Sequence, residues 1–458
     1  MRRSSWPAAH AWQPVAPAMS GVAQDGEVAA PPGWTASTSR ATLPQAPPEP
    51  ASVRRFALPT LLLVLGPGLM VMLADTDAGS IVTAAQSGTR WGYRLLALQL
   101  LLIPVLYLVM ELTVRLGVVT GKGHAELIRE EFGNRWALFS VGALIISAIG
   151  ALVTEFAGVA GIGRLFGLPA AATVIPAALA LIALVVTGGY RRVELVGITL
   201  GLFELAFVAA AVLTHPSAHA MAAGLVSTSS FSKPGFVELI AANVGAVIMP
   251  WMVFYQQGAV VQKRIQPRNL RAARIDTGIG AVLTQVVMAA VLVAAAATLH
   301  GGGHQLGSVA DLSAALSPAL GHETARYVLA LGVGGAALVA SIVVSLALAW
   351  AVAEALGKPR SLNDSVRRAP LFYGLFTASV TVGAALVLTS RSLVGLSVDV
   401  EVLNALLLPL VIGFLLALAA RVLPKRHSLS GKRRVALLVV LATVTAVGVL
   451  WVALSLGA

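Results

Sequence analysis

Two carboxylates stand in the middle of an apolar stretch of this chain, where a charged side chain is costly. Asp75 and Asp77 lie in the segment MLADTDAGSIV, residues 72–82, beside the hydroxyls of Thr76 and Ser80. Carboxylate, hydroxyl and carbonyl oxygens are the ligands that hard divalent cations prefer. A carboxylate at bilayer depth costs at least about 2.5 kcal/mol, so it usually has a functional reason or a partner. The segment therefore predicts a cation site.

The spacing of the two acids bears on whether they share that site. Two residues apart on a regular helix, Asp75 and Asp77 would point about 200° away from each other. In an unwound stretch, both can face one cavity together with free backbone carbonyls. The alternative is that a carboxylate caps the following half-helix or pairs with a basic residue, and this alternative is stronger for Asp75.

A second interruption is predicted in the segment GAVIMPWMVFYQQ, residues 245–257, at Met249–Trp251. There the carbonyls of Gly245 and Ala246 and the Met249 thioether can face the first break. A thioether favours soft or borderline ions and adds little for Mg²⁺. Interrupted helices at matching positions in two halves indicate an inverted-repeat transporter with a site at the midplane. A simple kink is the alternative for each break, since Gly and Pro are common in membrane helices.

Further polar side chains lie within apolar segments. Glu155 and Glu204 are candidates for a proton route or a supporting network, and a plain hydrogen bond between helices is the alternative. Glu401 and Asn404 share one helix face and can complete the cavity. Gln257 can line the path or simply join two helices.

The elements that position these residues are expected to be membrane helices. Hydrophobic residues make up 57% of the 458 residues and charged residues 11%, whereas soluble domains have about 25% charged residues. Many apolar runs approach the roughly 20 residues that cross a bilayer as a helix. The composition therefore predicts an all-α polytopic membrane protein, and a large soluble all-α protein is the alternative.

The apolar runs predict about eleven spans. They lie near 57–87, 93–117, 137–166, 169–188, 194–214, 237–262, 275–299, 325–356, 370–389, 396–420 and 435–456. Spans 1–5 and 6–10 would form two repeats, about 55–215 and 236–421, followed by the final helix. Residues 55–458 form the transmembrane domain in this prediction. Residues 1–54, rich in Pro, Ala and Ser and without a signal-peptide pattern, predict a disordered cytosolic tail.

Basic residues indicate the orientation. They concentrate in alternate short loops, near 122–135, 191–192, 263–274, 358–368 and 425–434. The positive-inside rule then puts the N-terminus in the cytoplasm and the C-terminus outside. The same rule accounts for the net charge of +12, so we expect no nucleic-acid partner, and the lipid bilayer is the surrounding medium.

Several chemistries find no support in the sequence. Without any cysteine, neither a disulfide nor a thiolate metal site can form. The phosphate-binding pattern G-x-x-x-x-G-K-[ST] does not occur, and no stretch is long enough for an ATPase domain. We therefore expect a secondary transporter or channel rather than an enzyme or a primary pump, with no ATPase subunit evident.

Three segments together resemble the Nramp family of divalent-metal transporters. They are GPGLMVMLADTDAGS, TVRLGVVTGKGHAELIRE and GAVIMPWMVFYQQGAVVQKR. The resemblance covers nearly the whole chain after the tail. It implies a LeuT-like fold of inverted five-helix repeats and inward transport of Mn²⁺, Fe²⁺ and related ions, usually with protons. The metal is then a transported substrate, and no cofactor is implied.

The family's motifs map onto this chain with changes. Its first-span motif Asp-Pro-Gly-Asn reads Asp77-Ala78-Gly79-Ser80, which keeps the acid and exchanges the amide for a hydroxyl. Its sixth-span motif Met-Pro-His reads Met249-Pro250-Trp251. The resemblance thus implies Asp77, Ser80, Ala246 and Met249 as metal ligands. Asp75 is an additional acid that favours a harder ion.

The differences from the family's motifs have one chemical feature in common. The family's histidine after the sixth-span proline is Trp251, and a second histidine is replaced by Gln257. The span-three motif Thr-Asp-Leu-Ala-Glu reads Thr154-Glu155-Phe156-Ala157-Gly158, so one of two acids is lost. These losses remove groups associated with proton passage and resemble the divergent Nramp-related magnesium transporters.

We therefore expect a secondary transporter or facilitator in a bacterial-type inner (plasma) membrane. It would import divalent cations, Mg²⁺ or the Mn²⁺/Fe²⁺ class, by alternating access with weak or no proton coupling. One alternative is a LeuT-fold amino-acid or organic-solute transporter, but such proteins bind a substrate carboxylate at half-helix N-termini, where two aspartates would repel it. The other is a membrane receptor or scaffold that transports nothing.

Overall fold

The computed structural model describes residues 66–227, 233–301, 306, 309–389 and 396–456. All regular elements within these ranges are helices, as expected. The expected tail, residues 1–54, and the start of the first expected span lie outside the described residues. The tail, the boundary at residue 55 and the division into two repeats stay predictions.

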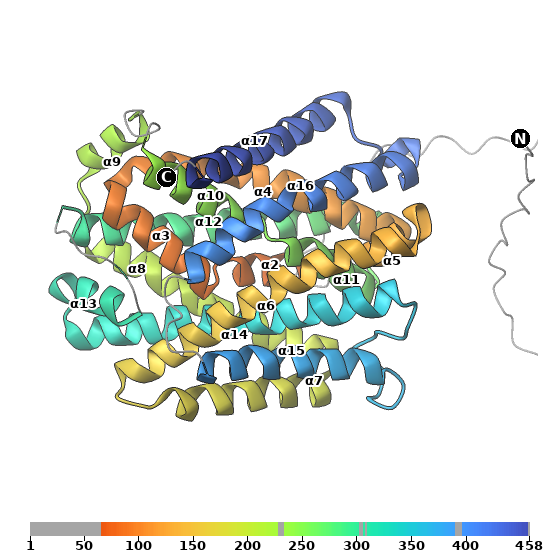
Figure 1. Ribbon diagram of the computed structural model, residues 1–458, viewed down its shortest axis with the longest axis horizontal. Coiled ribbons are helices and arrows are strands. Elements are labelled where there is room, and N and C mark those ends of the chain that lie inside the picture. Colours follow the sequence, from red (N-terminus) through yellow and green to blue (C-terminus); the bar gives the residue numbers. More distant parts are fainter. Residues whose placement is uncertain (1–65, 228–232, 302–305, 307–308, 390–395, 457–458) are drawn as a thin grey trace, which may run out of the picture. The chain divides into compact units, whose positions relative to one another are not determined.

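Long helices form the bundle seen in Figure 1. They are α4 (Leu96–Thr120), α6 (Asn134–Leu165), α7 (Ala170–Gly201), α12 (Leu270–Leu299), α14 (His322–Ala355), α15 (Pro370–Thr389), α16 (Leu396–Val422) and α17 (Gly431–Leu456). Shorter helices connect them: α5 (His124–Phe132), α8 (Ala206–Leu213), α9 (Ala218–Leu225) and α13 (Val309–Leu320). Four 3₁₀ turns complete the described chain: η1 (Gly92–Leu95), η2 (Leu202–Leu205), η3 (Pro267–Asn269) and η4 (Lys425–His427).

Both predicted interruptions are present. The first separates α2 (Pro67–Asp75) from α3 (Ala78–Trp91), and the second separates α10 (Pro234–Val247) from α11 (Pro250–Gln262). The sequence predicts interruptions over Asp75–Ser80 and over Met249–Trp251, and each break is narrower than that. Only Thr76 and Asp77, and then Ile248 and Met249, leave the helical conformation, because a capping aspartate and a first-turn proline restart the helix at once.

The helix boundaries do not by themselves give the number of membrane spans, because some helical stretches join two expected spans. Eight stretches of the described residues are long and apolar enough to cross a membrane. Ala78–Thr120 joins half of the first expected span to the next, and Ala170–Leu213 joins two expected spans. Within the latter, Gly189 has φ 64° and ψ 165°, which interrupts the helix and which glycine adopts without steric cost. The count of about eleven stays a prediction.

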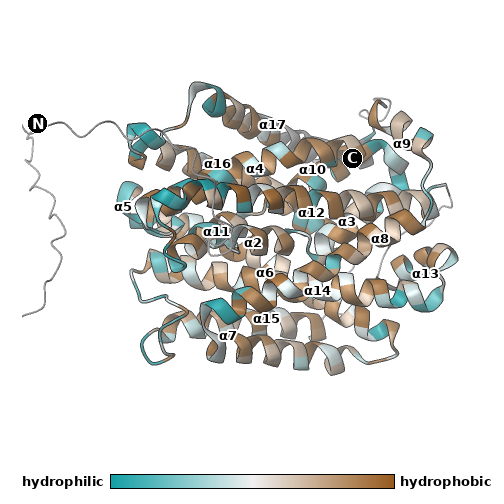
Figure 2. Ribbon diagram, turned by 180° about the vertical axis from the view of Figure 1, so that it is seen from behind, coloured by the Kyte–Doolittle hydropathy of each residue, from teal (hydrophilic) through white to brown (hydrophobic). Residues whose placement is uncertain are grey.

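The interrupted helices lie inside the bundle. Figures 1 and 2 place α2 and α11 in its middle, and nearly all of their residues are buried. Helix α12 packs against α2, α3 and α4, while α14 packs against α6, α11 and α15. Glycines permit these close approaches: a Cβ atom at Gly280 would lie 2.7 Å from Met72 Cγ. Figure 2 shows apolar residues along the long helices and hydrophilic ones at their ends.

Several basic segments expected on the inner side contact one another. Arg115 donates to the carbonyl of His427 at 3.0 Å, and Arg274 forms an ion pair with Glu111 at 2.5 Å. These contacts gather the ends of α4, α12 and η4 at one end of the bundle. That arrangement agrees with the expected side for these segments, while the orientation of the termini stays a prediction.

Candidate functional site

The first break is built around Asp77, whose backbone is extended with φ −73° and ψ 175°. Its Oδ1 atom accepts a hydrogen bond from the Ser80 backbone N–H at 2.7 Å, so Asp77 caps the N-terminus of α3. Aspartate suits this position because it satisfies a free N–H and its charge is favourable at the positive end of the helix dipole. The other oxygen, Oδ2, is buried and has no hydrogen-bond partner among the described residues. One oxygen of this carboxylate therefore remains for a ligand.

The second break leaves a backbone carbonyl without its helical partner. Ala246 lies in the last turn of α10, and Pro250, four residues later, has no N–H to donate to it. The Ala246 carbonyl instead accepts a hydrogen bond from Ser80 Oγ at 3.2 Å. This contact joins the two breaks and brings together three of the predicted ligands: Asp77, Ser80 and Ala246.

Met249 is fully buried at the second break, but its sulfur has a local partner. The Met249 sulfur accepts from the Met252 backbone N–H, and the Met249 N–H donates to the Met252 sulfur at 3.4 Å. The two side chains thus cap the first turn of α11 reciprocally, in the manner of a capping box. The sulfur points to α11, and a role as metal ligand stays a prediction.

Asp75 faces helix α12 rather than the second break. Thr284 Oγ1 donates to Asp75 Oδ2 at 3.5 Å, and Asp75 Oδ1 is buried without a partner. Neither of the alternative roles is seen, because Asp77 provides the cap of α3 and no described basic residue forms an ion pair with Asp75. Nothing in the sequence pointed to Thr284, which is 209 residues from Asp75 along the chain.

Two further acids support the first break. Glu155 on α6 accepts a hydrogen bond from the Ala78 backbone N–H at 3.2 Å, so it satisfies a second free N–H of α3. Glu401 on α16 accepts from Asn404 Nδ2 at 3.0 Å, and Asn404 Oδ1 accepts from Ser147 at 2.6 Å. The other carboxylate oxygen of Glu401, Oε1, is buried without a partner. The predicted supporting residues Glu155, Glu401 and Asn404 thus lie around α3, and their roles stay predictions.

Two glycines let α16 approach both breaks. A Cβ atom at Gly79 would lie 2.6 Å from Glu401 Oε1 and 3.4 Å from Asp77 Oδ1. At Gly245 it would lie 1.8 Å from the Glu401 carbonyl oxygen. The Glu401 carboxylate therefore stands over the start of α3, next to Asp77. Sequence reasoning missed this packing role, because a glycine does not reveal which neighbour it admits.

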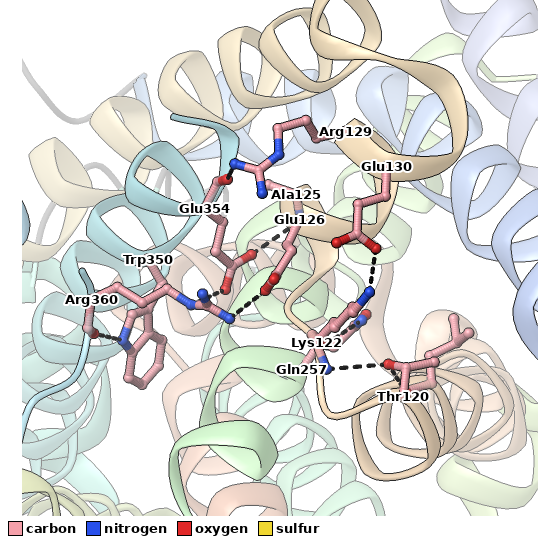
Figure 3. A network of polar contacts seen from close by, with 11 residues as sticks. Thr120, Lys122, Ala125, Glu126, Arg129, Glu130, Gln257, Trp350, Glu354 and Arg360 are labelled. Atoms are coloured by element: carbon pink, nitrogen blue, oxygen red, sulfur yellow. Dashed lines mark hydrogen bonds and ion pairs between the residues drawn. The ribbon is translucent and has the colours of Figure 1, made fainter. Parts of the chain in front are cut away.

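The remaining predicted pathway residues have different surroundings. Trp251 is fully buried in the first turn of α11, and its Nε1 has no hydrogen-bond partner in the part of the chain that the structure describes. Gln257 accepts a hydrogen bond from His124 Nδ1 at 3.0 Å. It also donates to the carbonyl of Lys122 at 3.0 Å (Figure 3). Burial lowers the pKa of His124 to about 4, so this ring is neutral near pH 7. The contacts of Gln257 join α11 to α5.

The charge of this region is unbalanced. Five carboxyl side chains are at most 1% exposed: Asp75, Asp77, Glu155, Glu204 and Glu401. No lysine, arginine or histidine in the described ranges forms an ion pair with any of them. Buried carboxylates without such partners require cations or protons. Within the described residues, no three His, Asp or Glu side chains form a metal-binding group by themselves, so a metal site here needs hydroxyl or carbonyl oxygens as well.

Comparison with known proteins identifies the family. The sequence profile described as natural resistance-associated macrophage protein-like matches residues 68–454, which include both breaks and the helices around them. The chain belongs to the Nramp family. The resemblance in the three sequence segments is thereby confirmed at the level of the family.

Two bacterial relatives of this Nramp chain are named as metal transporters. It is 28% identical over 354 residues to the "Divalent metal cation transporter MntH" of Verminephrobacter eiseniae, covering 73% of this chain and 79% of that protein. It is 31% identical over 287 residues to the MntH protein of Brucella suis, covering 59% and 62%.

Solved structures agree on the fold. The Eremococcus coleocola manganese transporter superposes with a TM-score of 0.73 at 21% identity, covering 86% of each chain. A sodium-coupled sialic acid symporter superposes with a TM-score of 0.57 at 12% identity, covering 79% of this chain and 84% of that one. Both likenesses concern the fold alone. The expected LeuT-like arrangement is confirmed.

Proposed function

We propose that this Nramp chain transports divalent metal ions into the cell by alternating access, with the ion held between the two helix breaks. The observation that carries the proposal is the contact of Ser80 Oγ with the Ala246 carbonyl beside the unpartnered oxygen of Asp77. Membership of the Nramp family and the names of the bacterial relatives support the same substrate class. The metal is the transported substrate, and the proposal involves no enzymatic step.

The spacing of the oxygens fits a small octahedral ion. Ser80 Oγ and the Ala246 carbonyl oxygen are 3.2 Å apart. Adjacent ligands of an octahedral ion lie about 3 Å apart when the metal–oxygen distance is about 2.1 Å. An ion can therefore replace the hydrogen bond with little movement of either helix, while Asp77 Oδ2 supplies the negative charge.

We further propose Mg²⁺ as the preferred cargo, with Mn²⁺ as the next candidate. The three oxygen donors are hard ligands, and the one soft donor nearby, the Met249 sulfur, is bonded to the first turn of α11. The family histidines are replaced by Trp251 and Gln257, which do not titrate. We therefore expect weak or no proton coupling, and internal acidification in step with metal influx would contradict this.

The other function classes are less well supported. An organic solute with a carboxylate would meet Asp77 and Glu401 at the start of α3, and both are acids. A receptor or scaffold would not need five buried carboxyl groups around the break. Titration calorimetry of the purified protein against Mg²⁺, Mn²⁺ and an amino acid separates the classes, and heat from the amino acid alone would reject the metal proposal.

We also propose a bacterial-type plasma membrane as the location, with the N-terminus in the cytoplasm and the C-terminus outside. The support is the asymmetry of basic loops in the sequence and the bacterial origin of the named relatives. Reporter fusions at each terminus test the orientation, and an active cytoplasmic reporter at the C-terminus would contradict it.

The decisive experiment is metal uptake into proteoliposomes by Asp77→Asn. Asparagine is a good N-cap, so the variant can keep the hydrogen bond to Ser80 N–H while losing the charge. We expect uptake to fall at least tenfold with little change in thermal stability. Asp364→Asn, in the partly exposed loop before α15, is the matched control and should transport normally. Near-normal uptake by Asp77→Asn would reject the site.

A further inference from the structure

The C-terminal end of α2 carries polar residues that contact α12, since both Asp75 and Thr76 hydrogen-bond to Thr284. Helices α7 and α12 pack along α2 through small residues. A Cβ atom at Gly197 would lie 2.5 Å from Met70 Cε, and one at Gly201 would lie 2.5 Å from Leu73 Cβ. Three residues after Gly201 comes Glu204, next to the position where α2 ends.

Glu204 is buried at this place without a partner. The residue is 0% exposed, and neither of its carboxylate oxygens has a hydrogen bond. The carboxylate lies near the hydroxyl of Thr76 and within electrostatic reach of Asp75. From the sequence, Glu204 is expected either in a proton route or supporting network or in a plain hydrogen bond between helices. Its nearest polar neighbour is the Thr76 hydroxyl, so both carboxylate oxygens can also take a ligand at this place.

Two hydroxyls complete the surroundings. Thr76 Oγ1 and Thr284 Oγ1 are 2.6 Å apart, and Thr284 Oγ1 also donates to Asp75 Oδ2 at 3.5 Å. The four side chains come from the last residue of α2, the first break, α12 and η2, and all are at most 1% exposed. Within the described ranges, three carboxylate oxygens here have no hydrogen-bond partner: Asp75 Oδ1 and both oxygens of Glu204. The group is therefore rich in acceptors and poor in donors.

We propose that Asp75, Thr76, Glu204 and Thr284 form a second binding site for a hard divalent cation, separate from the oxygens of Ser80 and Ala246. Two carboxylates and two hydroxyls are the oxygen donors that an ion of the Mg²⁺ class takes, with waters in the remaining positions. Asp75 then belongs to this second site and not to the site at Asp77.

The charge of the whole region supports a second ion. One divalent ion at Asp77 offsets two negative charges, whereas five buried carboxyl groups surround the first break and no described basic side chain pairs with them. A second ion between Asp75 and Glu204 offsets two more. This inference rests on the proposed function, since it assumes that the region takes up divalent metal.

The test is the number of Mn²⁺ ions bound by the purified full-length protein, measured by equilibrium dialysis in detergent. We expect two ions per chain for the natural sequence and one for Glu204→Gln. Thr284→Val should weaken the second ion at least tenfold. Thr298→Val is the matched control on the same helix, because its hydroxyl donates only to the Ala294 carbonyl, and it should bind two ions.

The outcomes separate the two proposals. One ion per chain that is lost in Asp77→Asn and kept in Glu204→Gln overturns the second site and leaves the proposed function standing. No bound ion in the natural protein overturns both. If Glu204→Gln does not fold, electron paramagnetic resonance of the natural protein decides: the second equivalent of Mn²⁺ should broaden the signal through spin–spin interaction. An unbroadened signal at two equivalents overturns the proposal.

Discussion

Replacing Gly245 by alanine tests how closely α16 must approach the second break. The added Cβ atom would lie 1.8 Å from the Glu401 carbonyl oxygen and 2.8 Å from the Ala405 backbone nitrogen. Both are backbone atoms of α16, so no side chain can rotate out of the way. Since ordinary contact begins at 3.4 Å and the built distance is 1.8 Å, the two helices must separate by about 1.6 Å.

The expected cost follows from that separation. Overpacking of a well-packed core costs about 1–3 kcal/mol, and a clash between two backbones belongs at the upper end. Alanine regains about 1 kcal/mol of helix propensity relative to glycine. We therefore expect a net loss of about 2 kcal/mol in stability. Because α16 also carries the Glu401 carboxylate over the start of α3, we expect metal uptake to fall at least tenfold.

The assay pairs a thermal melt of the detergent-solubilised protein with uptake into proteoliposomes. Gly413→Ala lies on the same helix α16, where an added Cβ has no neighbour within 4 Å, and serves as the control. We expect this control to melt at the same temperature or higher and to transport normally. If Gly245→Ala matches the control in both measurements, the close approach of α16 and its role at the site are refuted.

Three further predictions concern the ends of the helices. Asp276→Ala should cost about 2 kcal/mol in a thermal melt, because Asp276 accepts from three backbone N–H groups at the start of α2, and Asp276→Asn should recover part of it. Arg360→Ala should cost about 3 kcal/mol, since it leaves Glu354 buried without its ion-pair partner (Figure 3), and normal stability would contradict this. In the folded protein His124 has a pKa of about 4, whereas in the unfolded chain it takes up a proton near pH 6.5. The free energy of unfolding should therefore be at its highest above pH 6.5 and fall by about 3 kcal/mol towards pH 4. His124→Gln should flatten that part of the pH profile, and an unchanged profile would contradict the assignment.

Much of the architecture could be predicted from the sequence. A helix in a bilayer satisfies its own backbone hydrogen bonds. Apolar runs of sufficient length therefore predict membrane helices, whichever helices pack against them. The breaks were also predictable locally, because Pro250 has no N–H to continue the helix and Asp77 is a strong cap. Their pairing across two halves, and the three segments that resemble the Nramp family, were equally present in the sequence.

The sequence by itself thus determined a helical membrane protein of the Nramp family with two interrupted helices and acids at the first of them. Only the tertiary structure decided which side chains meet. Ser80 reaches the carbonyl of Ala246, 166 residues away, and Asp75 turns to Thr284 instead. The physical reason is that contacts between helices depend on their rotation and packing, which many small residues set together. Local sequence fixes where a helix breaks, but the helices packed around that break decide what its oxygens face.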